Sequence, residues 1–190
     1  MAEEIFEIRT SCEDNRPFDV DHRFTDGLDD DSSLNYSIIQ GDSMVDPATW
    51  RPWEFYCAEP GTDRVTDWDY YDLSGTAGLF SVRAIRVLQP YLDPSFTVLP
   101  ALLDGNEFYF VAIRNRLDCL SRSKSEILFF DDGTVRHIDR YVFQKSRVRD
   151  PLVFAIPEEI ATLFATESVV EASTAEGLMG FDYRLVDGRG

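Results

Sequence analysis

The sequence is poor in the residues that usually cross-link secreted domains or shuttle protons, with 3 Cys and 2 His in 190 residues. The cysteines Cys12, Cys57 and Cys119 cannot all pair, and none forms a C-x-x-C motif, which disfavours a disulfide scaffold and favours a reducing compartment. The first residues are acidic where a signal peptide is basic, and no apolar run approaches the ~20 residues of a membrane span. We therefore expect a cytoplasmic protein without a membrane segment.

Basic residues are also scarce, since 18 Lys and Arg stand against 35 Asp and Glu, for a net charge of −17. Such a charge repels phosphate backbones and anionic lipid surfaces, so direct binding of nucleic acid or membrane is disfavoured. The excess acid is concentrated in residues 1–80, which hold 19 acids and only 5 bases. By contrast, 14 Phe, 8 Tyr and 3 Trp supply enough apolar surface for a globular core.

The motifs of common catalytic sites are missing. His22 and His137 have no partner nearby in the sequence, and the cysteines and histidines lack the spacing of a zinc site. The segment 75–78 (Gly-Thr-Ala-Gly) precedes an expected helix but lacks the lysine and the spacing of a phosphate-binding loop. Cys119 lies between apolar residues, and we expect it to pack as a small hydrophobic side chain. We expect no cofactor and no metal.

Local patterns predict an α+β fold with antiparallel sheets, about three helices and an irregular acidic N-terminal section. In the first half, strands are expected at Glu4–Arg9 and Asn35–Gln40. A helix is expected with its body at Leu79–Leu92 and with Ser74 or Thr76 as its N-terminal cap. We divide the chain into an acidic, loop-rich section over residues 1–66 and an α+β domain over residues 67–186. Whether the first section is a separate domain stays open.

The second half shows clearer turn signals. One hairpin is expected over residues 96–113, with the turn at Asp104-Gly105-Asn106, and another over residues 126–143, with the turn at Asp131-Asp132-Gly133. The second strand of the latter has mixed faces, which indicates partial exposure or a bulge. The remaining predictions are a strand at Leu152–Ile156, a helix from Pro157 to Ala165, a helix at Glu167–Ala175, and a strand that begins at Gly180.

An aromatic and acidic segment, Asp67-Trp68-Asp69-Tyr70-Tyr71-Asp72, is one candidate site. Its carboxylates could share a hard cation such as Mg²⁺ or Ca²⁺. Because Trp and Tyr are enriched at protein interfaces, the segment could instead be an exposed recognition surface. The third possibility is ordinary packing of the aromatic rings with the acids directed outward.

The acidic run Asp29-Asp30-Asp31 is the other candidate. A run of this kind is usually a solvated loop, but it could also steer a basic partner toward the protein. Two clusters of basic residues are expected to form ion pairs within the chain rather than a nucleic-acid footprint, namely Arg114, Arg116, Arg122 and Lys124, and then Lys145, Arg147 and Arg149. We take Asp29, Asp30, Asp31, Asp67, Trp68, Asp69 and Asp72 as candidate partner-binding residues.

The order of several weak motifs resembles a family of bacterial immunity proteins from polymorphic toxin systems, a type first seen in myxobacteria. The similarity covers roughly residues 67–186, and it departs from the family pattern at Ser121, where an acid is expected. The motifs are Asp67-Trp68, residues 79–85 with Leu88 and Leu92, Leu99-Pro100, residues 108–110, residues 117–120 with Ser123 or Ser125, residues 132–135 with 141–143, residues 153–157 and residues 177–181.

The resemblance implies a small cytoplasmic protein that binds a cognate toxin domain and blocks it, with no catalytic residues to carry over. Two other functions stay open on the sequence alone. One is an effector chaperone or adaptor, which binds a toxin without inhibiting it. The other is a metal-dependent enzyme that uses Asp67, Asp69 and Asp72. The oligomeric state is not predicted.

Overall fold

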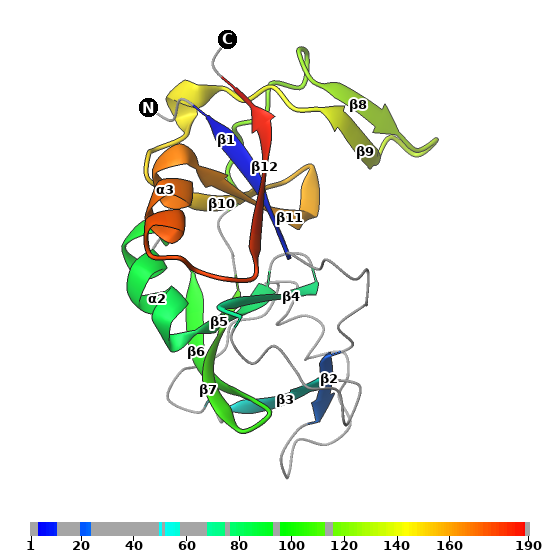
Figure 1. Cartoon of the computed structure of the whole chain (residues 1–190). Helices are drawn as coiled ribbons and strands as arrows, with labels where there is room; N and C mark the ends of the chain where they lie inside the picture. Colours follow the sequence, from blue (N-terminus) through cyan, green and yellow to red (C-terminus); the bar gives the residue numbers. More distant parts are fainter. Residues whose placement is uncertain are drawn as a thin grey trace.

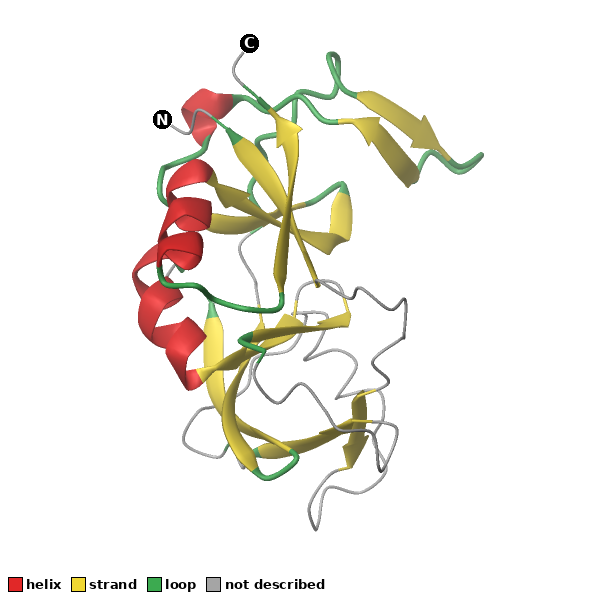
Figure 2. Ribbon diagram, in the orientation of Figure 1, coloured by secondary structure: helices red, strands yellow, loops and turns green. Residues whose placement is uncertain are grey.

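The computed structural model describes residues 4–10, 20–23, 50, 52–57, 68–74, 77–92, 96–112 and 116–188. The described strands form three sheets, and the described α-helices lie together on one side of them (Figures 1 and 2). The strands are β1 (Ile5–Thr10), β2 (Val20–Arg23), β3 (Trp53–Cys57), β4 (Tyr70–Ser74), β5 (Ala77–Ser81), β6 (Thr97–Leu103), β7 (Asn106–Ala112), β8 (Glu126–Phe129), β9 (Val135–Arg140), β10 (Val153–Ile156), β11 (Glu159–Thr166) and β12 (Phe181–Asp187).

The helical content of the described residues is small. It consists of α2 (Val82–Leu88), α3 (Glu167–Ala175) and two short 3₁₀ turns, η1 (Gln89–Tyr91) and η2 (Lys145–Arg147). The α+β class is therefore correct, but the described chain holds two α-helices rather than about three. Neither helix is long or apolar enough to span a membrane.

A four-stranded sheet has the order β10-β11-β1-β12, and its neighbouring strands are antiparallel. The strand predicted near the start of the chain, β1, lies inside this sheet, where Ile5 faces Thr166 of β11 and Asp187 of β12. Residues from the first 66 positions therefore complete a sheet whose other strands all come from the C-terminal part of the chain.

A six-stranded sheet has the order β2-β3-β6-β7-β5-β4, with one parallel pair between β3 and β6. The predicted hairpin with the Asp104-Gly105-Asn106 turn is confirmed as β6–β7, in register from Thr97 opposite Ala112 to Leu103 opposite Asn106. Asp104 and Gly105 have φ angles of 48° and 77°, the left-handed conformation that such two-residue turns require. A cluster of aromatic rings lies on this sheet, where Phe110 is 0% exposed.

Two predicted helices differ from the structure: the one at Leu79–Leu92 is wrong over part of its length, and the one at Pro157–Ala165 over all of it. Leu79 and Phe80 belong to strand β5, because residues 77–81 pair with β4 on one side and β7 on the other. The helix α2 begins only after Ser81, whose hydroxyl accepts a hydrogen bond from the Ala84 amide at 3.0 Å.

The segment from Pro157 to Ala165 is not a helix either. Pro157 lies in the turn after β10, and residues 159–166 form β11, which pairs with β10 and β1. The proline and the two acids after it are local signals that favour the start of a helix. The pairing of β11 with a strand on each of its edges overrides these signals. The predicted elements β10, α3 and β12 are confirmed, and the strand predicted at Asn35–Gln40 lies outside the described residues.

The third sheet is the hairpin β8–β9, which projects away from the body of the molecule (Figure 1). It confirms the prediction of a hairpin around Asp131-Asp132-Gly133, including the irregular pairing, since its register shifts at two places. Gly133 has a φ of 82°, which explains why the turn carries a glycine. Ile138 is 1% exposed and joins the core under the four-stranded sheet, so the base of the hairpin is anchored.

Candidate partner-binding surfaces

Asp69, one of the candidate recognition residues, lies inside the protein. It is 4% exposed, and its two carboxylate oxygens accept hydrogen bonds from the Ser81 hydroxyl at 2.5 Å and from the Met179 amide at 2.8 Å. Its own amide donates to the Met179 carbonyl at 2.8 Å. The expectation of an outward-facing carboxylate is therefore wrong for Asp69, because the chain itself uses both oxygens.

The Asp69 contacts connect two distant parts of the chain to the start of helix α2. Ser81 both donates to Asp69 and caps α2, and Arg83 of that helix donates to the backbone carbonyls of Glu176 and Gly177 at the end of α3. These bonds satisfy carbonyls that a helix C-terminus leaves without partners. Asp69 is thus a structural residue that holds the turn after α3 against the loop before β4.

Among the neighbours of Asp69 in the sequence, the aromatic side chains pack fully or partly inside the protein and Asp72 is exposed. Trp68 is partly buried, and its ring lies 5.8 Å from that of Tyr71, which is 1% exposed. Asp72 is exposed, and its amide donates to the Thr10 hydroxyl at 3.3 Å. Ordinary packing of the aromatic residues therefore describes Trp68 and Tyr71, while partner binding by Trp68 and Asp72 stays a prediction. Asp67 and the acidic run Asp29-Asp30-Asp31 lie outside the described residues.

The predicted ion pairs are confirmed for three of the seven basic residues. Arg122 contacts Glu158 at 2.6 Å, Lys145 contacts Asp187 at 3.4 Å, and Arg147 contacts Asp118 at 3.2 Å. Arg122 and Arg147 line a shallow depression of 490 Å³ together with Ser121, Ser123 and Gln144. Because both arginines already bind carboxylates of the same chain, the depression is better described as a salt-bridged surface than as a ready anion site.

Four titratable groups with a raised pKa, Cys119, Tyr70, Tyr141 and Tyr183, belong to the packing of the described chain. Burial raises the pKa of the Cys119 thiol to about 12, and Cys119 is fully buried, as predicted for a small hydrophobic side chain. Burial also raises the pKa of Tyr183 to about 12 and that of Tyr70. The pKa of Tyr141 is raised by burial and by the hydrogen bond that its hydroxyl donates to Glu159. Within the part of the chain that the structure describes, no group of three Asp, Glu, His or Cys side chains is arranged to hold a metal ion.

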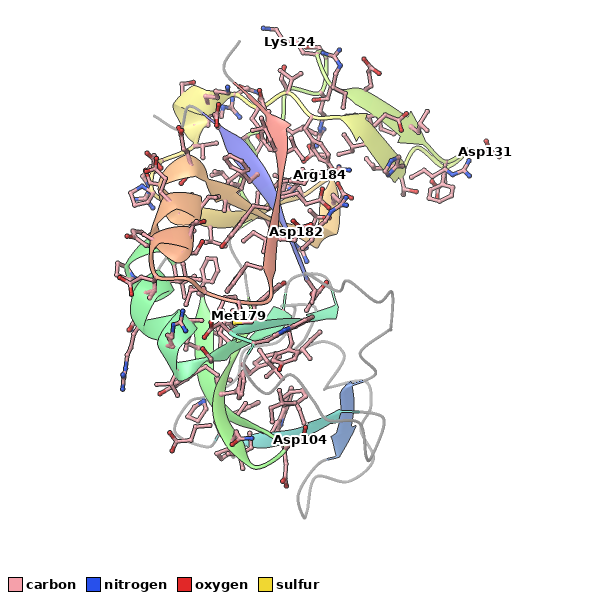
Figure 3. The ribbon with its side chains drawn as sticks, in the orientation of Figure 1. Asp104, Lys124, Asp131, Met179, Asp182 and Arg184 are labelled. Carbon is pink, nitrogen blue, oxygen red and sulfur yellow. The ribbon has the colours of Figure 1, made fainter. Side chains whose placement is uncertain are left out.

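An exposed apolar surface lies on the β8–β9 hairpin. Among the described residues, five large hydrophobic side chains are strongly exposed, and three of them are consecutive: Leu128 at 49%, Phe129 at 56% and Phe130 at 53%. We call these three residues the apolar tip. They precede the turn that contains Asp131, at the end of the hairpin farthest from the body (Figure 3).

Sequence reasoning did not select the apolar tip, since an Ile-Leu-Phe-Phe run resembles an ordinary core strand. A signal was nevertheless present in the opposite strand, Val-Arg-His-Ile-Asp-Arg, in which four of six residues are polar or charged. Such a strand adds little apolar surface to either face of a two-stranded sheet. The structure shows the result, because Leu128 pairs with His137 and Phe129 with Val135, and no other described strand joins the sheet.

The turn and the flanks of the hairpin are ordered by polar contacts. The Asp132 carboxylate accepts hydrogen bonds from the Thr134 amide at 2.9 Å and from its hydroxyl at 2.6 Å, which lower the pKa of Asp132. The Arg136 guanidinium lies 5.9 Å from the centre of the Phe130 ring, within the range of a cation–π contact. Near the base, Arg140 donates to Glu126 at 2.7 Å.

The α+β body thus presents a hairpin on which three large apolar side chains are about half exposed. Residues 98–187 match the model of a family described as an immunity protein family, Imm11. The match includes the whole β8–β9 hairpin and confirms, over this part of the chain, the resemblance to an immunity protein family. No curated protein matches the chain.

Proposed function

We propose that this protein is an immunity protein that binds and neutralises a cognate bacterial toxin domain by occluding it, without catalysis. The observation that carries the proposal is the match of residues 98–187 to an immunity protein family. Neutralisation by occlusion requires only a complementary surface and sufficient affinity, and it places no demand on reacting groups. We place the action in the cytoplasm of the cell that makes the toxin.

The charge of the chain supports a partner with a basic surface. A net charge of −17 creates a negative potential around the molecule, and opposite charge on the partner raises the association rate at low salt. Speed matters for an inhibitor, because a toxin acts until it is bound. The run Asp29-Asp30-Asp31 has three consecutive acidic residues, and we propose that it steers the partner toward the protein.

The test of the function is co-expression with the protein encoded beside this gene. If the proposal is right, the neighbour alone stops growth, co-expression restores it, and the two proteins purify as a stable complex. A catalytically inactive variant of the neighbour allows the complex to be measured without toxicity. Complex formation without restored growth would instead support an effector chaperone or adaptor. A toxic neighbour that neither binds nor is neutralised would refute the proposal.

The steering role is tested by replacing Asp29, Asp30 and Asp31 with Ser and measuring association with the inactive toxin by stopped flow. We expect slower association and a weaker dependence on salt, with little change in dissociation. A matched variant with Ser at Glu107, Glu171 and Glu176, which are exposed, removes the same charge elsewhere. Equal slowing by both variants would assign steering to net charge alone, and unchanged rates would remove the acidic run as a contact.

A further inference from the structure

We propose that the apolar tip, Leu128-Phe129-Phe130, is the toxin-docking element of this protein and enters an apolar cleft that is bordered by basic side chains of the toxin domain. The inference rests on the proposed function, because it names the surface that the immunity protein uses. It differs from the sequence-based expectation, which placed the contact on the acidic segments near residues 29–31 and 67–72.

The first argument is the cost of leaving these side chains in water. Three consecutive large apolar side chains, each about half exposed, are unfavourable for a free protein unless a partner covers them. Aromatic residues, Phe among them, are also enriched in the core of protein interfaces, where their large rings lose contact with water. The tip thus combines exposure with two residues of a type that interfaces favour.

The second argument is that the hairpin holds the tip in place before binding. The turn is closed by the Phe130 amide, which donates to the Thr134 carbonyl at 2.8 Å, and by the two bonds that Asp132 accepts. At the other end, Ile138 is buried in the core, and the Val142 amide donates to the Ser125 hydroxyl at 3.0 Å. A preformed element loses less conformational entropy on binding than a flexible loop does.

The third argument concerns the charge beside the apolar tip, which indicates what kind of partner surface the tip would fit. The turn places the exposed carboxylates of Asp131 and Asp132 directly after Phe130. The nearby cations are held within the hairpin, since Arg140 binds Glu126 and Arg136 lies over the Phe130 ring. A partner surface that accepts this end of the molecule must therefore offer an apolar cleft next to Lys or Arg, in agreement with the net charge of −17.

The test compares the apolar tip with equally exposed apolar residues elsewhere. One variant carries Leu128→Ser, Phe129→Ser and Phe130→Ser; the control carries Met179→Ser and Leu185→Ser, whose side chains are 48% and 49% exposed. Affinity for the inactive toxin is measured by calorimetry or interferometry. We expect the tip variant to bind at least about 30-fold more weakly, the loss of one interface hot spot, and the control to stay within about threefold of wild type.

A second measurement does not depend on the stability of the variant. A photoreactive benzoylphenylalanine replaces Phe129 in one protein and Leu185 in the control, and each is irradiated in complex with the inactive toxin. Cross-linking from position 129 and none from position 185 supports docking through the tip. The reverse pattern overturns the inference, even if the serine variant unfolds.

The remaining outcomes separate this inference from the function on which it rests. Wild-type affinity in a folded tip variant overturns the inference and leaves the proposed function intact. A wild-type protein that fails to bind or neutralise the toxin refutes the function itself. If the free protein sediments as a dimer that the tip variant converts to a monomer without loss of toxin affinity, the tip joins two copies of this chain, and the inference is overturned.

Discussion

The hairpins β6–β7 and β8–β9 are built from similar sequences and have opposite roles in the structure. Each has apolar residues in its first strand and a turn that contains Asp-Gly, yet β6–β7 lies within a six-stranded sheet whereas β8–β9 forms a sheet by itself. Phe110 of the first hairpin is 0% exposed and Phe129 of the second is 56% exposed. The apolar run alone does not make a core strand; other parts of the chain must pack on its faces, as they do on the edge strand β10, whose residues are all buried.

The largest expected difference between the hairpins is the effect of removing an aromatic ring. Phe110 stacks against Phe55, with ring centres 6.5 Å apart, and contacts Trp53. Phe110→Ala should therefore lower the free energy of unfolding by about 3–5 kcal/mol, whereas Phe129→Ala should change it by less than about 0.5 kcal/mol. Urea denaturation followed by tryptophan fluorescence measures both. Similar losses in the two variants would contradict the comparison.

The base of the projecting hairpin should behave like core rather than like its tip. Ile138 is 1% exposed and packs with residues of the four-stranded sheet, so Ile138→Ala should cost about 2–3 kcal/mol of stability. Leu128→Ala, ten positions earlier in the same hairpin, is the matched control and should cost little. A small effect at Ile138 would mean that the whole hairpin, and not only its tip, is independent of the core.

Replacing the turn glycine should have different effects in the hairpin inside a larger sheet and in the hairpin that forms a sheet by itself. Gly105 and Gly133 have φ angles of 77° and 82°, and a methyl group at either position would meet open space. Alanine there costs about 1–2 kcal/mol for the backbone conformation alone. We expect Gly105→Ala to show this cost in global unfolding. Gly133→Ala should instead speed hydrogen exchange of the β8–β9 amides, because that turn can open locally.

The ion pair between Arg140 and Glu126 should contribute least among the hairpin contacts that we test by mutation. Both side chains are more than half exposed, at 58% and 62%, so solvent and salt screen their attraction. Arg140→Gln should lower stability by less than about 0.5 kcal/mol, and 1 M NaCl should remove the difference from wild type. A larger loss that salt does not reduce would indicate that Arg140 supports the hairpin through its bond to the Lys124 carbonyl.

A pH titration gives the smallest expected effect and concerns only the β8–β9 turn. The pKa of Asp132 is lowered by the hydrogen bonds from Thr134, so these bonds contribute fully above the pKa of an unfolded aspartate. They weaken as the pH falls through the lower, folded pKa. The Thr134 amide shift, followed by NMR, should therefore titrate below the range of an ordinary aspartate. In Thr134→Val, where the hydroxyl is absent, the midpoint should move back up.

The turns and the strands at both ends of the chain were predictable because their signals are local. Asp-Gly turns need residues that tolerate a positive φ, and Gly180 before β12 meets the same need, with a φ of 89°. The alternation of Phe181, Tyr183 and Leu185 marked β12, and Gly177 marked the end of α3. The family resemblance could also be drawn from sequence, because several ordered motifs survive even where each one is weak.

The failures have a common cause in pairing between distant segments. Residues 77–81 and 159–166 carry patterns compatible with a helix, but each becomes a strand because two neighbouring strands bind its edges. Asp69 shows the same effect at a candidate site, since its partner Met179 is far away in the sequence. The acidic pattern of this segment did not reveal that Asp69 is buried and Asp72 is exposed.

The position of β1 between β11 and β12 sets the order of events during synthesis. Its residues are made well before those of its two partners, which begin at Glu159 and Phe181. At typical translation speeds this interval is on the order of ten seconds, during which β1 has no place in a sheet. The four-stranded sheet can therefore close only after β12 has been made, and until then the chain has no complete β10-β11-β1-β12 surface.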